Sequence, residues 1–119
     1  MKVTGLLHVA LLSSDLEASK QFYEGVLGLK QKPRPSLAFP GVWYELGDVE
    51  LHLIVTAEQL LSANERPNRD FHLALAVEDY ESIKKQLEDT GVPFKERSAG
   101  VAQIFVRDPD GNLIELQSV

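Results

Sequence analysis

Two histidines in this sequence stand in matching frames. His8 and His72 each lie in an apolar run, and seven residues after each comes an aspartate, Asp15 and Asp79. A glutamate and a lysine then follow at the same offsets, so the two copies are separated by a constant 64 residues. A fixed internal spacing is typical of a repeated supersecondary unit. The sequence therefore predicts an internal duplication of one supersecondary unit, with a potential metal ligand in each copy.

The pattern around each histidine predicts which side chains share a face. Side chains alternate between the two faces of a strand, so His8 and Ala10 point one way while Leu7 points the other, towards a helix. In the second copy His72 shares its face with alanines, and Phe71 points towards the helix side. We expect each histidine to lie on an alanine-lined, concave face.

The ends of the two copies correspond as well. His52 stands between two leucines, and Glu115 stands between an isoleucine and a leucine, in the strand that follows each copy's turn. If a pseudo-twofold axis relates the copies, four side chains converge on one point: His8, His52, His72 and Glu115. A lone histidine in an apolar strand is more often a hydrogen-bonded core residue. The joint position of all three histidines of the chain nevertheless favours a site for one divalent metal ion, of Fe, Mn, Ni, Zn or Co.

The elements that must position these residues follow from hydrophobic periodicity and from helix caps. The first copy predicts, in order, strand 5–12, helix 16–27, strand 29–32 and a hairpin of strands 42–46 and 49–55. The second copy predicts strand 70–77, helix 80–90 and strands 93–97, 102–107 and 112–117. Asp15 and Asp79 are the predicted N-caps, and Gly47 with Asp48 suits a tight hairpin turn. The polar segment 56–69 between the copies is expected to hold one helical turn near 58–62.

This order predicts an α+β fold of two tandem βαβββ modules, which form a cupped mixed sheet around a metal site. The chain of 119 residues is long enough for a single domain, 1–119. Within it we expect module one at about 3–56, a linker at about 57–69 and module two at about 70–119. A ferredoxin-like order is the alternative, but it would leave the hairpin at the end of each half unused.

Composition excludes several classes of function. The chain is 44% hydrophobic and 25% charged, as globular proteins are, and its net charge of −6 argues against nucleic acid or an anionic membrane surface as a partner. It has no cysteine, which excludes disulfides and thiolate metal sites and fits the cytoplasm. No run approaches the roughly 20 apolar residues that a membrane helix needs.

The motifs resemble those of the vicinal oxygen chelate superfamily, which includes glyoxalase I, fosfomycin resistance transferases, extradiol dioxygenases and bleomycin resistance proteins. The resemblance covers nearly the whole chain. It rests on the runs 6–11, 15–23, 26–29 and 71–77, and above all on 107–116, Arg-Asp-Pro-Asp-Gly-Asn-Leu-Ile-Glu-Leu. It implies a homodimer in which His8, His72 and Glu115 hold the metal and His52 is a fourth ligand or a general base.

By the same resemblance, the chain is a metal-dependent, glyoxalase-like lyase or isomerase that acts on a small oxygenated substrate, with catalytic roles for His52 and Glu115. Glyoxalase I has a glutamate where His52 stands, so the reaction itself stays open. Tyr44, Arg97 and Arg107 are candidates for binding an anionic substrate. The alternatives are an extradiol-type dioxygenase, or a metal-free protein that sequesters a drug-like ligand against Trp43, Tyr44 and Phe39.

Overall fold

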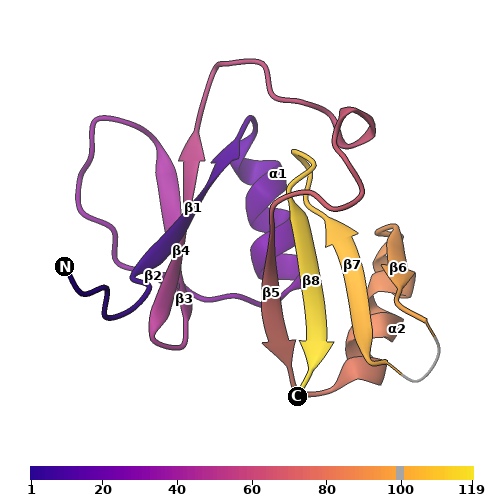
Figure 1. The fold of residues 1–119 in the computed structure, drawn as a ribbon. Helices are drawn as coiled ribbons and strands as arrows, with labels where there is room; N and C mark the ends of the chain where they lie inside the picture. Colours follow the sequence, from indigo (N-terminus) through magenta and orange to yellow (C-terminus); the bar gives the residue numbers. More distant parts are fainter. Residues whose placement is uncertain (99–100) are drawn as a thin grey trace. The chain divides into compact units, whose positions relative to one another are not determined.

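A computed structural model describes residues 1–98 and 101–119, which form two compact units (Figure 1). The N-terminal unit is Met1–Gln59 and the C-terminal unit is Leu60–Val119, and each is described by itself. Each contains a strand, a helical segment and three further strands. The predicted α+β fold of two tandem βαβββ modules is therefore confirmed, and the observed order of elements rules out the ferredoxin-like alternative.

The N-terminal unit is a four-stranded mixed sheet with one helical segment. Its elements are β1 (His8–Ser13), α1 (Leu16–Lys20), η1 (Gln21–Val26), β2 (Gln31–Lys32), β3 (Gly41–Leu46) and β4 (Val49–Val55). The strands lie in the order β1-β4-β3-β2, with β1 parallel to β4 and the other pairs antiparallel. Strand β4, the last of the unit, therefore lies between β1 and its hairpin partner β3.

The C-terminal unit repeats this arrangement. Its elements are the 3-10 turn η2 (Ala63–Glu65), β5 (His72–Val77), α2 (Tyr80–Thr90), β6 (Phe94–Glu96), β7 (Gln103–Arg107) and β8 (Leu113–Ser118). The strand order is β5-β8-β7-β6, with β5 parallel to β8. Figure 1 shows α2 along one face of this sheet. Among the described residues, no helix is both long and apolar enough to cross a membrane.

The two predicted caps fix where the helices begin. The Asp15 carboxylate accepts a hydrogen bond from the backbone N–H of Ala18 at 3.2 Å, and that of Asp79 accepts one from Ser82 at 3.0 Å. Each bond satisfies an N–H group that the first helical turn leaves unpaired. Gly91 ends α2 in the left-handed region, with φ of 72°, as a helix C-terminus commonly requires.

Several predicted boundaries differ from the structure, three of them most clearly. The segment 16–27 is not one α-helix, because α1 passes into a π-helical turn that contains Gly25, a poor helix former. The helical turn between the units lies at Ala63–Glu65 and not near 58–62. The first strand begins at His8 rather than at residue 5, because its pairing with β4 starts opposite Glu50.

Burial separates the two faces of each sheet. The helix-facing side carries the core, which includes Leu51 and Leu53 in the N-terminal unit and Ile114 and Leu116 in the C-terminal unit, all at most 1% exposed. Leu7 and Phe71, which the sequence pattern places under the helices, are 81% and 71% exposed because each lies just before its strand begins. The histidine-bearing face of each sheet is the other side.

Candidate metal and substrate site

In the N-terminal unit, His52 is held between two other rings. It lies opposite Ala10 on β1 and opposite Trp43 on β3, so all three share a face. The centroid of its imidazole lies 4.2 Å from that of His8 and 4.1 Å from that of Trp43, with both pairs of rings nearly parallel. His52 is 8% exposed, and the stack fixes the plane of its ring.

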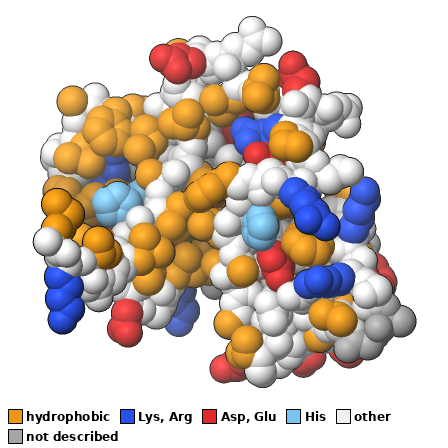
Figure 2. Space-filling model, in the orientation of Figure 1, with side chains coloured by type: hydrophobic (Ala, Val, Ile, Leu, Met, Phe, Trp, Pro, Cys, Tyr) orange, Lys and Arg blue, Asp and Glu red, His pale blue; other side chains and the backbone are white. Residues whose placement is uncertain are grey.

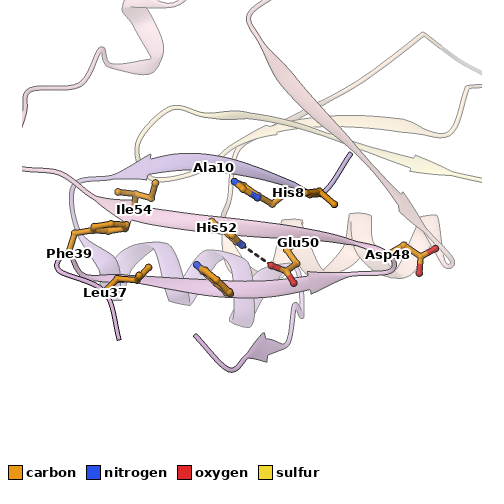
Figure 3. Close-up of a pocket in the computed structure, with 10 residues that line it drawn as sticks. His8, Ala10, Leu37, Phe39, Asp48, Glu50, His52 and Ile54 are labelled. Carbon is orange, nitrogen blue, oxygen red and sulfur yellow. Dashed lines mark hydrogen bonds and ion pairs between the residues drawn. The ribbon is translucent and has the colours of Figure 1, made fainter. Parts of the chain in front are cut away.

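Glu50 fixes which nitrogen of His52 carries hydrogen. Nε2 of His52 lies 2.9 Å from Oε1 of Glu50, and the other oxygen of Glu50 accepts a hydrogen bond from the Lys32 ammonium (Figure 3). The Lys32 bond, followed by the His52 bond, lowers the pKa of the Glu50 carboxyl. Because an ionised carboxylate can only accept, Nε2 of His52 is the protonated nitrogen. A neutral His52 therefore has its lone pair on Nδ1.

The same face of the N-terminal unit is hollowed and largely apolar. The hollow has a volume of about 560 Å³. Its lining includes Leu37 and Phe39 from the loop before β3 and, from the strands, His8, Ala10, Trp43, Glu50, His52 and Ile54 (Figure 3). Phe39 comes from the proline-containing loop before β3, and the Arg34 guanidinium lies over its ring. This side of the sheet suits an apolar or aromatic group.

In the C-terminal unit, His72 and Glu115 form the corresponding pair. Glu115 lies opposite Ala74 on β5 and opposite Phe105 on β7, as His52 does between its neighbours. Nδ1 of His72 lies 2.9 Å from the backbone oxygen of Asp70, so Nδ1 carries hydrogen and donates it. Nε2 of His72 lies 3.3 Å from Oε2 of Glu115. A neutral His72 thus directs a lone pair towards the carboxylate.

A second hollow, of about 1050 Å³, includes this pair, and basic residues dominate its charge. Its charged lining residues are Arg66, Arg69, Lys95, Arg97, Arg107 and Glu115. Figure 2 shows Lys and Arg side chains gathered around one histidine and apolar side chains around the other. The two histidine faces therefore differ in charge.

Tyr44, one of the three predicted substrate-binding residues, does not line either hollow. Tyr44 is fully buried on the helix-facing side, opposite Leu51, and its hydroxyl donates to Glu24 at 2.7 Å. Burial, with the Glu24 bond, raises the pKa of this phenol. Tyr44 thus lies on the opposite face of the sheet from His52, because directly paired residues share a face.

Arg107 lines the C-terminal hollow, but its guanidinium ties loops together. It donates to the backbone oxygens of Gly111 and Pro67, at 2.8 and 3.1 Å, and to Asp70 at 3.3 Å. Arg97 lines the same hollow and donates to the neutral side chain of Gln103 at 2.7 Å. Only Arg97 of the three combines a place in the hollow with a charge that no recorded acid neutralises in the described part of the chain.

Sequence reasoning missed residues on both faces. Glu50 and Lys32 were overlooked, although Glu50 has the same strand parity as His52 and could have been found from it. Lys95 was missed too; it lies opposite Phe105 in the row that contains Glu115. Arg66 and Arg69 belong to the segment between the copies, where no periodicity indicates a position.

The possible metal donors come in pairs within each unit. Among residues 1–98 and 101–119, neither unit by itself gathers three His, Asp or Glu side chains in an arrangement that could hold a metal ion. The donor types do fit a divalent metal, since imidazole nitrogens and a carboxylate are common ligands of first-row ions. The bond from Nδ1 of His72 to a backbone carbonyl is the outer contact that metal-binding histidines usually make.

The sequence profile of one protein family matches residues 5–116, almost the whole chain. That family is the Glyoxalase/Bleomycin resistance protein/Dioxygenase superfamily. The chain belongs to this superfamily. The resemblance in its motifs is thereby confirmed, and so is the expectation of a glyoxalase-type fold.

Individual members of the superfamily resemble the chain over most of its length. Glyoxylase I 4 of Arabidopsis thaliana is 32% identical, over 98% of this chain and 71% of its own length. A lactoylglutathione lyase of Salmonella typhimurium is 33% identical, over 93% of this chain and 90% of its own. The fosfomycin resistance protein FosX of Listeria monocytogenes shares the fold, with a TM-score of 0.79 at 16% identity, over 98% of this chain and 91% of its own.

Proposed function

We propose that this protein is a metal-dependent, glyoxalase-like lyase or isomerase that acts on a small oxygenated substrate. The proposed ligands of its divalent metal ion are His8, His52, His72 and Glu115. When bound, such an ion would polarise neighbouring oxygens of the substrate as a Lewis acid. The names of relatives support the reaction class, because a glyoxylase and a lactoylglutathione lyase are among them.

The observation that carries the proposal is the His72–Glu115 pair. Its two facing atoms, Nε2 and Oε2, lie 3.3 Å apart, and Asp70 holds the hydrogen of His72 on the far nitrogen. Two electron-pair donors aimed at each other repel unless a proton or a cation lies between them. Glu115 is only 8% exposed, whereas the side chain of His72 is 38% exposed, so water screens that repulsion from the His72 side only. A metal ion satisfies both donors.

The chain's own residues have distinct proposed tasks. Glu115 and His72 hold the ion, and His8 supplies a further nitrogen. His52 has Nδ1 available, because Glu50 occupies its Nε2. That nitrogen can bind the ion as a fourth ligand or accept a proton from the substrate, and the Trp43 stack holds it at a fixed orientation for either task. The apolar hollow beside it would exclude water from the reacting group.

Metal analysis tests the proposal directly. Protein purified without a nickel column should contain near-stoichiometric first-row metal, and His72→Ala and Glu115→Gln should reduce it to traces. Glu96→Gln is the matched control, because Glu96 lies on the opposite face of the same sheet, bound to Tyr80 and Lys84. Turnover of lactoylglutathione should fall with metal content across the variants. Metal that is substoichiometric in the wild type and unchanged in His8→Ala would contradict the proposal, whereas iron accompanied by oxygen uptake would identify a dioxygenase.

A second candidate is a protein that sequesters an aromatic ligand without metal. The apolar hollow of about 560 Å³, in which Trp43 stacks on His52, favours it. An aromatic ligand would then quench Trp43, the one tryptophan of the chain, equally well before and after treatment with a chelator. If the chelator abolishes both binding and turnover, the enzyme is favoured over sequestration.

A further inference from the structure

Three positively charged side chains of the C-terminal hollow lack an acidic partner. Arg66 and Arg107 share the carboxylate of Asp70, at 3.2 and 3.3 Å. The side chains of Lys95 and Arg69 make no hydrogen bond or ion pair within residues 1–98 and 101–119, and that of Arg97 donates only to Gln103. The hollow therefore holds more positive charge than its own acids neutralise.

The acid nearest in sequence to these cations faces away from them. Glu96 is the last residue of β6 and lies between Lys95 and Arg97, and alternation turns its side chain to the other face of the sheet. There its carboxylate accepts from the Tyr80 hydroxyl at 2.7 Å and pairs with Lys84 at 3.3 Å. Lys95 and Arg97 thus keep their charge on the side of the sheet that bears Glu115.

Positive charge is concentrated in the C-terminal hollow although the chain as a whole is acidic. The chain as a whole carries a net charge of −6, yet four of its five arginines line this one hollow. Like charges that line one hollow together create a positive potential there, which attracts anions. Arginine forks and lysine ammonium groups are the usual partners of carboxylate and phosphate oxygens.

We propose that Lys95, Arg97 and Arg69 bind an oxyanion group of the substrate, a carboxylate or a phosphoryl-type group, beside His72 and Glu115. The inference names the substrate class of the proposed enzyme and to that extent rests on the proposed function. Arg107 is excluded from this role because loop carbonyls and Asp70 occupy its guanidinium.

The N-terminal unit supplies the matched control. Lys32 lies opposite Trp43 as Lys95 lies opposite Phe105, but Glu50 binds the Lys32 ammonium. A change at Lys32 removes a charge at the equivalent strand position without touching the C-terminal hollow. Lys32→Met and Lys95→Met therefore separate binding in this hollow from a general loss of positive charge.

Calorimetric titration with inorganic phosphate, and separately with acetate, tests the proposal. We expect saturable binding of at least one of the two, weakened by NaCl, and about tenfold weaker in Lys95→Met and in Arg97→Met but unchanged in Lys32→Met. Tighter phosphate binding would identify a phosphoryl-type group, and tighter acetate binding a carboxylate. Lys95→Gln repeats the test if the methionine variant fails to fold.

Metal content and anion binding should be separable. Glu115→Gln should lose the metal and still bind the anion at least as tightly, because Glu115 is the only acid among the described residues that line the hollow. Lys95→Met should keep its metal. Absence of saturable binding of both anions, or equal weakening in Lys32→Met and Lys95→Met, would overturn the proposal whatever the metal analysis shows.

Discussion

The two units have the same row of strand positions across the histidine-bearing face, but this face is largely apolar in the N-terminal unit and positively charged in the C-terminal unit. One row of four positions crosses each sheet from its first strand to its edge. In the N-terminal unit it reads Ala10, His52, Trp43 and Lys32. In the C-terminal unit it reads Ala74, Glu115, Phe105 and Lys95. The strand order is the same in the two units, so along this row the difference lies in the side chains.

One neighbouring position accounts for much of this difference. Glu50 lies opposite His8 in the N-terminal sheet, and Leu113 lies opposite His72 in the C-terminal sheet. Glu50 neutralises Lys32 and holds His52, whereas a leucine can do neither. A single acid therefore pairs the charges on one face, whereas on the other face Lys95 has no acidic partner within residues 1–98 and 101–119.

The largest expected effect tests whether the frame itself is equivalent in the two units. Leu51 and Ile114 occupy matching core positions, and both are fully buried. Truncating either to alanine should lower the free energy of unfolding by about 2–5 kcal/mol, because a cavity replaces packed methyl groups. Urea unfolding followed by far-UV circular dichroism measures the loss, and Trp43 fluorescence follows the N-terminal unit separately. Leu12→Ala is the control at a position that is 41% exposed, and a loss there as large as in Leu51→Ala would contradict the assignment of faces.

A smaller effect is expected from making the N-terminal face resemble the C-terminal one. Glu50→Leu removes the acceptor of Nε2 of His52 and the partner of Lys32. We expect the His52 tautomer with hydrogen on Nε2 to lose its preference, and the thermal midpoint to fall by less than in Leu51→Ala. Long-range proton–nitrogen NMR of the imidazoles measures the tautomer. Glu50→Gln should retain it, because an amide oxygen still accepts, and an unchanged His52 spectrum in Glu50→Leu would show that Glu50 does not position the ring.

Most of the frame could be predicted from the sequence, because local patterns determine it. Strand β4 and helix α2 have the predicted bounds, since a tight turn, an aspartate cap and a terminal glycine mark them. The predicted turn at Gly47 and Asp48 also determines which residue of β3 lies opposite His52. A two-residue turn pairs Leu46 with Val49, and counting outwards brings Trp43, not Tyr44, opposite His52.

The rest depends on contacts between residues far apart in the chain. Arg107 donates hydrogen bonds to Asp70 and to the backbone oxygen of Pro67, and no local sequence pattern indicates these partners. The exposure of Leu7 and Phe71 likewise follows from where pairing with another strand begins, and not from their own apolar character. The positions of Arg66 and Arg69 depend on the path of an irregular segment. The strand positions of the proposed ligands were therefore predictable, but their hydrogen-bond partners and the cationic hollow were not.

The smallest expected effect concerns a tyrosine–glutamate pair that each unit uses to tie its helical segment to a strand. In the N-terminal unit the strand supplies Tyr44 and the helical segment supplies Glu24, whereas in the C-terminal unit α2 supplies Tyr80 and β6 supplies Glu96. Removal from water, and then the Glu96 bond, raises the pKa of Tyr80 from 10.0 to about 12. The folded state therefore holds this proton more tightly than the unfolded state does.

The stabilisation from Tyr80 should be fully present below pH 10 and be lost as the pH rises towards 12. The difference in thermal midpoint between wild type and Tyr80→Phe should accordingly be constant near neutrality and shrink across that window. The pKa of Tyr44 is raised further because its phenol is fully buried, so the difference between wild type and Tyr44→Phe should be larger and persist to higher pH. Midpoints measured between pH 8 and 12 test both variants. A Tyr44→Phe difference that vanished in the same window as that of Tyr80→Phe would mean that burial does not distinguish the two pairs, and that the units differ only on their histidine faces.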